Sequence, residues 1–236
     1  MKEAYEHYEL HFLKLNSTEK TAFESASKGY ENFYGKFLPV DKNAKILDLG
    51  CGIGHFLYFL KSKGYTNFFG IDHSKKQIDF IQNNITKKAK VADAFEFLNN
   101  KKNYFQLIVI NDVLEHIPKE KLFDFLRLVL NSIEPGGAVF IKVPNMSNPF
   151  GLRSRYISIT HEIGFTEHSL LEVLEIVKFS DIKIIGSFSP VISFKSLIVK
   201  IARAFIYKIL RLMFLLQGYP PPKILTKDVI AIAKKK

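Results

Sequence analysis

Residues 46–54 read Ile-Leu-Asp-Leu-Gly-Cys-Gly-Ile-Gly, an apolar run that ends in a carboxylate and is followed by three glycines in steps of two. The apolar run 44–49 predicts a buried strand, and residues 55–63 predict the helix behind it. A glycine-rich turn between a strand and a helix lets a ligand lie against bare backbone, next to the helix amides. The stretch therefore predicts a site for a nucleotide-like cofactor.

The spacing of the glycines separates the cofactor classes. A dinucleotide-binding turn has its third glycine at position 55, where this chain has His55, whereas here the third glycine is Gly54. The string D-x-G-x-G-x-G, with a cysteine between two glycines, resembles the first motif of class I S-adenosylmethionine-dependent methyltransferases. The alternative is a Rossmann-type turn that serves another nucleotide or none. The resemblance implies that S-adenosylmethionine is bound by Asp48, Gly50, Cys51, Gly52 and Gly54.

Two acidic positions follow in the order that this family shows. Residues 65–71 predict a second strand that ends at Asp72, about 20 residues past the glycine turn, where a carboxylate can hold ribose hydroxyls, with His73 beside it. In the family, an Asp after the third strand reaches the adenine amino group and its neighbour packs on the ring, which implies these roles for Asp93 and Ala94. The alternative role of both carboxylates is to cap a helix, and Ser74 could cap the helix over 75–84 instead.

The segment Asn111-Asp-Val-Leu-Glu-His-Ile-Pro118 follows the apolar run 105–110, which predicts a central parallel strand. The motif D-V-L-E-H-I-P over 112–118 resembles that of the methyltransferase subgroup that contains ubiquinone-type O-methyltransferases and sugar-modifying relatives. The resemblance places Asn111 and Asp112 beside the methionine part of the cofactor, close to the acceptor. A helix over 119–133, a turn at 134–137 and a strand over 138–143 are expected next.

The second half of the chain is expected to select the acceptor. Residues 160–170, Thr-His-Glu-Ile-Gly-Phe-Thr-Glu-His-Ser-Leu, resemble a segment of methyltransferases encoded with bacterial surface-polysaccharide genes. His161 is the first candidate general base because an imidazole titrates near working pH, with His116 second and Glu162 orienting the imidazole. The alternative for His161 is an ordinary hydrogen-bonded loop residue.

Three residues just before this segment are candidates for holding a phosphate or carboxylate of the substrate: Arg153, Arg155 and Tyr156. The alternative for the arginines is solvated surface charge. The histidines and carboxylates show no convincing ligand spacing, so no metal is predicted.

The order of strands and helices predicts an α/β fold, a Rossmann-like doubly wound sheet of seven mostly parallel strands. The last strand, 229–233, is expected to pair antiparallel at the sheet edge. All 236 residues are assigned to one methyltransferase domain. Its parts are an N-terminal helical cap over 1–40, in which Tyr5 and Tyr8 could close over the cofactor, a cofactor-binding half over 41–145 and an acceptor-binding half over 146–236.

The chain carries a net charge of +11 but no recognisable nucleic-acid module, so an anionic small molecule is expected rather than nucleic acid. Within helix 192–216 the cations Lys200, Arg203, Lys208 and Arg211 share one face about 140° wide at 100° per residue, and most of the other residues are apolar. Three contacts stay open for it: the protein core, a second copy in a homodimer, or an acidic membrane surface.

Cys51 is the only cysteine, and the first residues lack the apolar run of a signal peptide, so a cytoplasmic location is expected, with membrane association through the helix as a further option. The expected function is O-methylation of a small sugar, sugar nucleotide or phosphate-containing precursor of a surface polysaccharide. The alternatives are a quinone-type phenol, an amino sugar nitrogen, tRNA, or a non-catalytic nucleotide-binding or scaffold protein.

Overall fold

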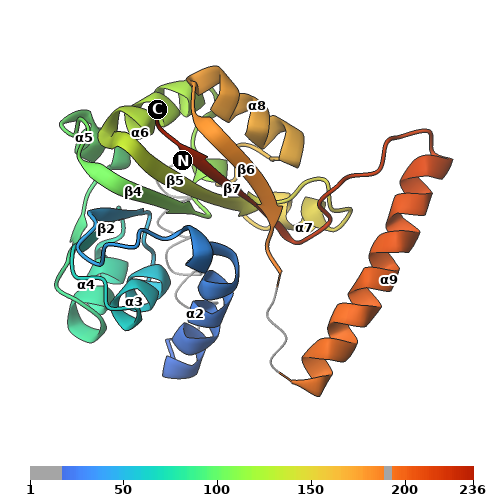
Figure 1. The fold of residues 1–236 in the computed structure, drawn as a ribbon, viewed down its shortest axis with the longest axis horizontal. Helices are drawn as coiled ribbons and strands as arrows, with labels where there is room; N and C mark the ends of the chain where they lie inside the picture. Colours follow the sequence, from blue (N-terminus) through green and yellow to red (C-terminus); the bar gives the residue numbers. More distant parts are fainter. Residues whose placement is uncertain (1–17, 189–192) are drawn as a thin grey trace.

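The computed structural model describes residues 18–188 and 193–236, which form one seven-stranded sheet in the order β3-β2-β1-β4-β5-β7-β6 (Figure 1). Strands β1 to β5 run parallel, and β7 is antiparallel to both of its neighbours. The expected α/β class with an antiparallel last strand is confirmed. The strands are β1 (Ile46–Leu49), β2 (Phe68–Asp72), β3 (Ala89–Val91), β4 (Phe105–Asn111), β5 (Ile133–Pro144), β6 (Ser180–Gly186) and β7 (Asp228–Lys234).

Helices cover both faces of this sheet (Figure 1). Because neighbouring strand residues point to opposite faces, Ile46 packs in the core under α2, α3 and α4, whereas Leu47 packs in the core under α6 and α8. The helices are α2 (Lys20–Tyr34), α3 (His55–Ser62), α4 (Lys75–Asn84), α5 (Ala94–Asn99), α6 (Leu122–Ser132), α7 (Gly151–Tyr156), α8 (Glu167–Val177) and α9 (Phe194–Leu216), with 3-10 turns η1 (Gly35–Phe37), η2 (Leu114–His116) and η3 (Lys119–Lys121).

The expected place of the last strand at the sheet edge is wrong. Strand β7 lies between β5 and β6, and β6 forms the edge. The reason is visible in the side chains: residues 229–233 are apolar and buried throughout, as a strand paired on both sides requires. Residues 180–184 alternate between exposed and partly buried, which suits an edge.

Strand β5 also begins earlier than expected. It starts at Ile133, which pairs with Phe105, and the predicted turn at 134–137 becomes an irregularity inside the strand, where the register with β4 shifts between Phe105 and Leu107. Gly136 absorbs the local change of direction with a φ of +79°.

Helix α9 does not pack into the core. The helix follows β6 and precedes β7 along the chain, and it stands apart from the sheet (Figure 1). None of its residues, all of which belong to the described part of the chain, is buried. The core alternative for helix 192–216 is therefore wrong. At the other end of the chain, α2 packs on α3 as part of the expected N-terminal cap, while Tyr5 and Tyr8 lie outside the described residues.

Candidate cofactor and acceptor site

A cavity of about 560 Å³ opens at the carboxyl ends of the parallel strands β1, β2 and β4. Ligands of doubly wound sheets bind at this edge, where the loops from neighbouring strands diverge. Ten of the residues predicted to bind the cofactor line it: Asp48, Gly50, Cys51, Gly52, Asp72, His73, Asp93, Ala94, Asn111 and Asp112.

The glycine turn holds its backbone against the floor of this cavity. Gly50 has a φ of +72°, and a Cβ there would lie 2.3 Å from Cγ2 of Val113, so no other residue fits. Gly54 has a φ of +87° and caps α3, where a Cβ would meet Ile81 and Ile85. Gly54 is not among the lining residues, and its positive φ and close packing show a role at the start of α3, while its predicted contact with the cofactor stays a prediction.

Asp72 ties the glycine turn to the end of β2. Its Oδ2 accepts the N–H of Gly52 at 2.9 Å, and its Oδ1 accepts the N–H of Ser74 at 2.9 Å. The cap of α4 is Ser74, whose Oγ accepts the N–H of Gln77. Asp93 both lines the cavity and caps α5, because its Oδ1 accepts the N–H of Glu96 at 3.0 Å.

Asp48 is the buried acid beneath the turn. Its Oδ2 has no hydrogen-bond partner among the described residues. Burial, and then the nearby Asp72 carboxylate, raise the pKa of Asp48 to about 8. An unpaired carboxyl oxygen beside the cavity favours a positively charged or hydrogen-donating ligand.

The variant Asp48→Asn is expected to change how stability depends on pH. The folded pKa of about 8 lies above the unfolded value of about 3.9, so the wild-type free energy of unfolding falls by about 1.4 kcal/mol per pH unit across this window and levels off above it. Asparagine does not titrate, so the free energy of unfolding of the variant rises relative to that of the wild type between pH 5 and pH 8. Urea unfolding at both pH values measures this gain, and an equal difference at both would contradict it.

The end of β4 is held by polar contacts that the sequence did not reveal. Lys142 of β5 forms an ion pair with Asp112, which has a φ of +55°. Burial lowers the pKa of this lysine, but attraction to Asp112 and Asp228 outweighs it, so the pKa is raised and the lysine stays charged. The hydroxyl of Tyr34 donates to Oδ1 of Asn111 at 2.7 Å, which links α2 to the same edge.

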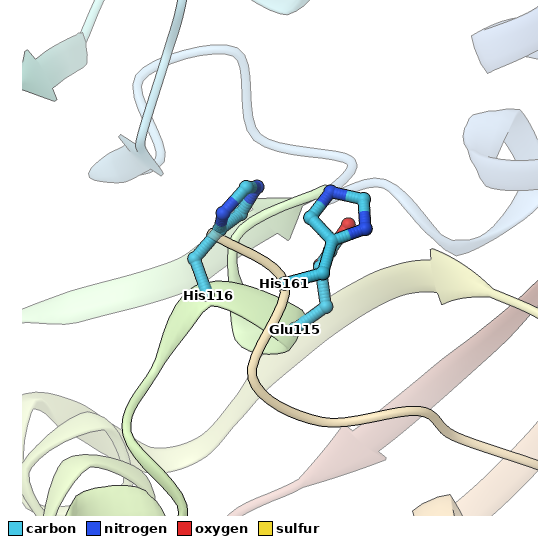
Figure 2. Close-up of side chains that lie close together, drawn as sticks. All are labelled: Glu115, His116 and His161. Carbon is cyan, nitrogen blue, oxygen red and sulfur yellow. The ribbon is translucent and has the colours of Figure 1, made fainter. Parts of the chain in front are cut away.

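His116 and His161 face each other beside the cavity (Figure 2). Their ring centroids are 4.6 Å apart at an interplanar angle of 81°, and His116 also lines the cavity. Nδ1 of His116 donates to the carbonyl of Thr160 at 3.2 Å, and Nδ1 of His161 donates to the carbonyl of Ser154 at 2.8 Å. Burial lowers the pKa of both, that of His116 to about 4, so both rings are neutral at pH 7 with the lone pair on Nε2.

Glu115 completes this cluster, and the sequence did not single it out. One ligand atom from each of Glu115, His116 and His161 lies within 4.8 Å of the others (Figure 2). Oε2 of Glu115 is buried without a partner among the described residues, and burial raises its pKa. Two imidazoles and a carboxylate form a ligand set that suits zinc or iron. The sequence shows no regular spacing of metal ligands, but this does not argue against such a set. The fold brings His161, in the loop before α8, next to Glu115 and His116 of η2.

The structure rearranges the expected acceptor residues. The Glu162 side chain is exposed, so the proposed orienting role is corrected: the carbonyl of Ser154 holds the His161 ring. The guanidinium of Arg155 donates to the backbone carbonyls of His161 and Glu162. Arg155 thus pins the histidine loop, while Arg153 and Tyr156 are exposed. None of the three lines the cavity among the described residues, so their predicted role in substrate binding has no support from its geometry.

The cavity also uses residues that the sequence did not single out. Tyr30 reaches it from α2, Phe95 lies in the first turn of α5 directly after Ala94, and Lys121 lies on η3. Phe95 offers a flat apolar surface for an aromatic ligand, and its place directly after Asp93 and Ala94 is a signal that could have found it. The sequence around Tyr30 carries no signal that would distinguish it from the packing aromatics near it.

Comparisons with known proteins agree with this geometry. Residues 20–180 match a family described as a methyltransferase domain. An uncharacterized protein of Rickettsia prowazekii (strain Madrid E), RP028, is 29% identical, with 68% of each chain covered. A solved S-adenosylmethionine-dependent methyltransferase from Archaeoglobus fulgidus is 25% identical with a TM-score of 0.65, over 90% of this chain and 96% of the other.

A solved methyltransferase from Thermotoga maritima, described as a possible histamine N-methyltransferase, has a TM-score of 0.67 over the full length of both chains at 13% identity, and at this identity it shows the fold alone. The family match and the Archaeoglobus structure support S-adenosylmethionine as the cofactor, as expected from the sequence. The matched region 20–180 includes the glycine turn, the residues that line the cavity and the histidine pair. The chain belongs to the methyltransferase-domain family.

Proposed function

We propose that this methyltransferase transfers a methyl group from S-adenosylmethionine to a hydroxyl or phosphate-type oxygen of a small glycan precursor. The observation that carries the choice of oxygen is the neutral pair of histidines at the edge of the cofactor cavity. A neutral imidazole can accept a proton from a hydroxyl, whereas an acceptor that is already anionic needs no base.

The residues that line the cavity fit the cofactor. Asp72 offers carboxylate oxygens for ribose hydroxyls, and Asp93 with Phe95 forms a polar edge and an apolar face for a base. The unpaired Oδ2 of Asp48 and the bare backbone of the glycine turn suit the amino acid end, which carries a cationic amine. When bound, S-adenosylmethionine supplies a methyl group on a sulfonium, a good electrophile that needs alignment more than activation.

His161 is the proposed general base. Its Nδ1–H is held by the carbonyl of Ser154, which leaves the basic lone pair on Nε2, and Arg155 fixes the loop that carries it. His116 is the second choice and the residue of the pair that lines the cavity. The buried carboxyl group of Glu115 lies beside the two rings and can accept a proton from them.

The nature of the acceptor rests on the sequence resemblance of residues 160–170 to surface-polysaccharide methyltransferases and on the excess of positive charge. The second candidate acceptor is an amino sugar nitrogen, the alternative that the sequence analysis leaves open. A quinone-type phenol is the third.

Calorimetry with S-adenosylhomocysteine and, separately, with NAD tests the cofactor. Binding of the first and not of the second is expected, and the reverse would overturn the proposal. Transfer of a labelled methyl group is then screened over sugar nucleotides, sugar phosphates, amino sugars and catechols. Label on an oxygen of a sugar or phosphate supports the proposed acceptor class, and label only on amine nitrogen or on a phenol replaces it.

A further inference from the structure

Helix α9 exposes a continuous apolar surface. Seven residues in steps of three or four share one side about 80° wide at 100° per residue, and each exposes at least 44% of its surface. We call them the apolar stripe: Phe194, Ile198, Ile201, Phe205, Ile209, Leu212 and Leu216. Exposed apolar side chains scattered singly are normal, but seven in one row on one helix mark an interaction surface.

Another side of α9 is cationic. Its basic stripe consists of Lys200, Arg203, Lys208 and Arg211, and Lys195 adds a fifth cation in the first turn. The 23 residues contain no Asp or Glu. A second copy of the helix therefore brings no counter-charge, and pairing two copies gathers ten cations at one contact. An anionic surface supplies the missing charge.

Both the length and the attachment of α9 suit a helix that lies flat. At 1.5 Å per residue it is about 35 Å long, and none of the described helices is long and apolar enough to cross a membrane. A side chain of the basic stripe fixes its end, since Arg211 donates to the carbonyl of Lys223 at 2.9 Å. The N–H of Lys223 in turn donates to Glu167 of α8 at 2.7 Å. The helix stands apart from the sheet (Figure 1), and the side chains of its apolar stripe are exposed.

We propose that α9 docks the protein on an anionic lipid surface, with the apolar stripe in the interface between head groups and acyl chains and the basic stripe beside the head groups. An amphipathic helix with a broad apolar side and a cationic polar side binds in this way. The inference does not depend on which acceptor is methylated, since it uses no residue of the cavity.

The chain has no Trp, so Phe205→Trp places a single fluorescent reporter on the apolar stripe. Vesicles of phosphatidylcholine with about one third phosphatidylglycerol are expected to shift its emission to the blue and to sediment the protein, as an apolar, lipid-facing site does. The matched reporter Val40→Trp, on a side chain 96% exposed and outside α9, is expected to keep its emission. No shift at position 205, or an equal shift at both positions, would overturn the proposal.

Charge and apolar surface are then tested separately. Each cation near an anionic surface strengthens binding about fivefold, so Lys200→Gln with Lys208→Gln is expected to weaken partitioning about 25-fold. The matched pair Lys87→Gln with Lys102→Gln, exposed and outside α9, removes the same charge and is expected to have far less effect. If the two pairs weaken partitioning equally, binding depends on the net charge of the protein and not on α9, and the proposed docking surface is rejected.

The apolar stripe is changed by Phe205→Gln with Ile209→Gln, which is expected to abolish sedimentation with vesicles while leaving the melting temperature unchanged, because both side chains are exposed. Analytical ultracentrifugation of the wild type without lipid is expected to show a monomer. A dimer that dissociates in this variant, together with no vesicle binding by the wild type, would assign the apolar stripe to a second copy and overturn the proposal.

Discussion

Replacing His161 with alanine is expected to lower turnover by about 100-fold or more while the affinity for S-adenosylhomocysteine stays within about twofold. General acid–base catalysis by a positioned side chain contributes about 10² to 10⁴ in rate. His161 is not among the residues that line the described cavity, so its loss leaves the cofactor contacts intact. Single-turnover transfer of labelled methyl measures the rate, and calorimetry measures the affinity.

The matched control is Glu162→Ala. This neighbour has an exposed side chain, and its backbone N–H, which the substitution keeps, donates to the carbonyl of Glu115 at 2.7 Å. Turnover of the control is expected to stay near that of the wild type. Unchanged turnover in His161→Ala would remove this residue from the mechanism, and a matching loss of cofactor affinity would reduce it to a packing role.

The cluster with Glu115 provides a second readout of the same variant. If a chelator abolishes wild-type turnover and a divalent metal restores it, His161 acts as a ligand rather than as a base, because base catalysis by imidazole needs no metal. Turnover that is indifferent to the chelator supports the base.

The cofactor half of the site was predictable because its signals are local. The glycines at 50, 52 and 54 need positive φ within one turn, and Asp72 and Asp93 end or follow short strands that the apolar pattern reveals. Parallel strands then bring these positions to one edge of the sheet, so the strand ends already indicate where the cavity lies.

The acceptor half was not predictable in the same way because its contacts join distant segments. From sequence, Arg155 looks available for a substrate anion, but in the fold its guanidinium binds the carbonyls of the histidine loop. Glu115 reads as one polar residue in a motif, and only the approach of the loop before α8 places His161 above it. Similarly, the apolar run at 229–233 predicts a strand but not that β6 shields its other edge.

Replacing Asp72 with asparagine is expected to weaken binding of S-adenosylhomocysteine about 100-fold. Both carboxylate oxygens accept backbone N–H groups, from Gly52 and from Ser74. An amide of the same shape offers one acceptor oxygen and places its NH₂ group against the backbone N–H of Gly52 or Ser74. One of the two hydrogen bonds is then lost, which loosens the glycine turn. It also removes the charge that would strengthen the proposed hydrogen bonds to ribose hydroxyls, and each hydrogen bond to a charged group contributes about 1.5 to 3 kcal/mol.

Calorimetry with S-adenosylhomocysteine isolates this effect, because the product lacks the sulfonium charge and reports the ribose and turn contacts. The control is Asp79→Asn on α4, an exposed carboxylate paired only with Lys75 among the described contacts, which is expected to leave the affinity unchanged. A melting temperature measured for each variant separates a loosened turn from unfolding. An affinity of Asp72→Asn within threefold of the wild type, in a folded protein, would show that the end of β2 does not hold the ribose. The polar edge formed by Asp93 would then be the main anchor of the nucleoside.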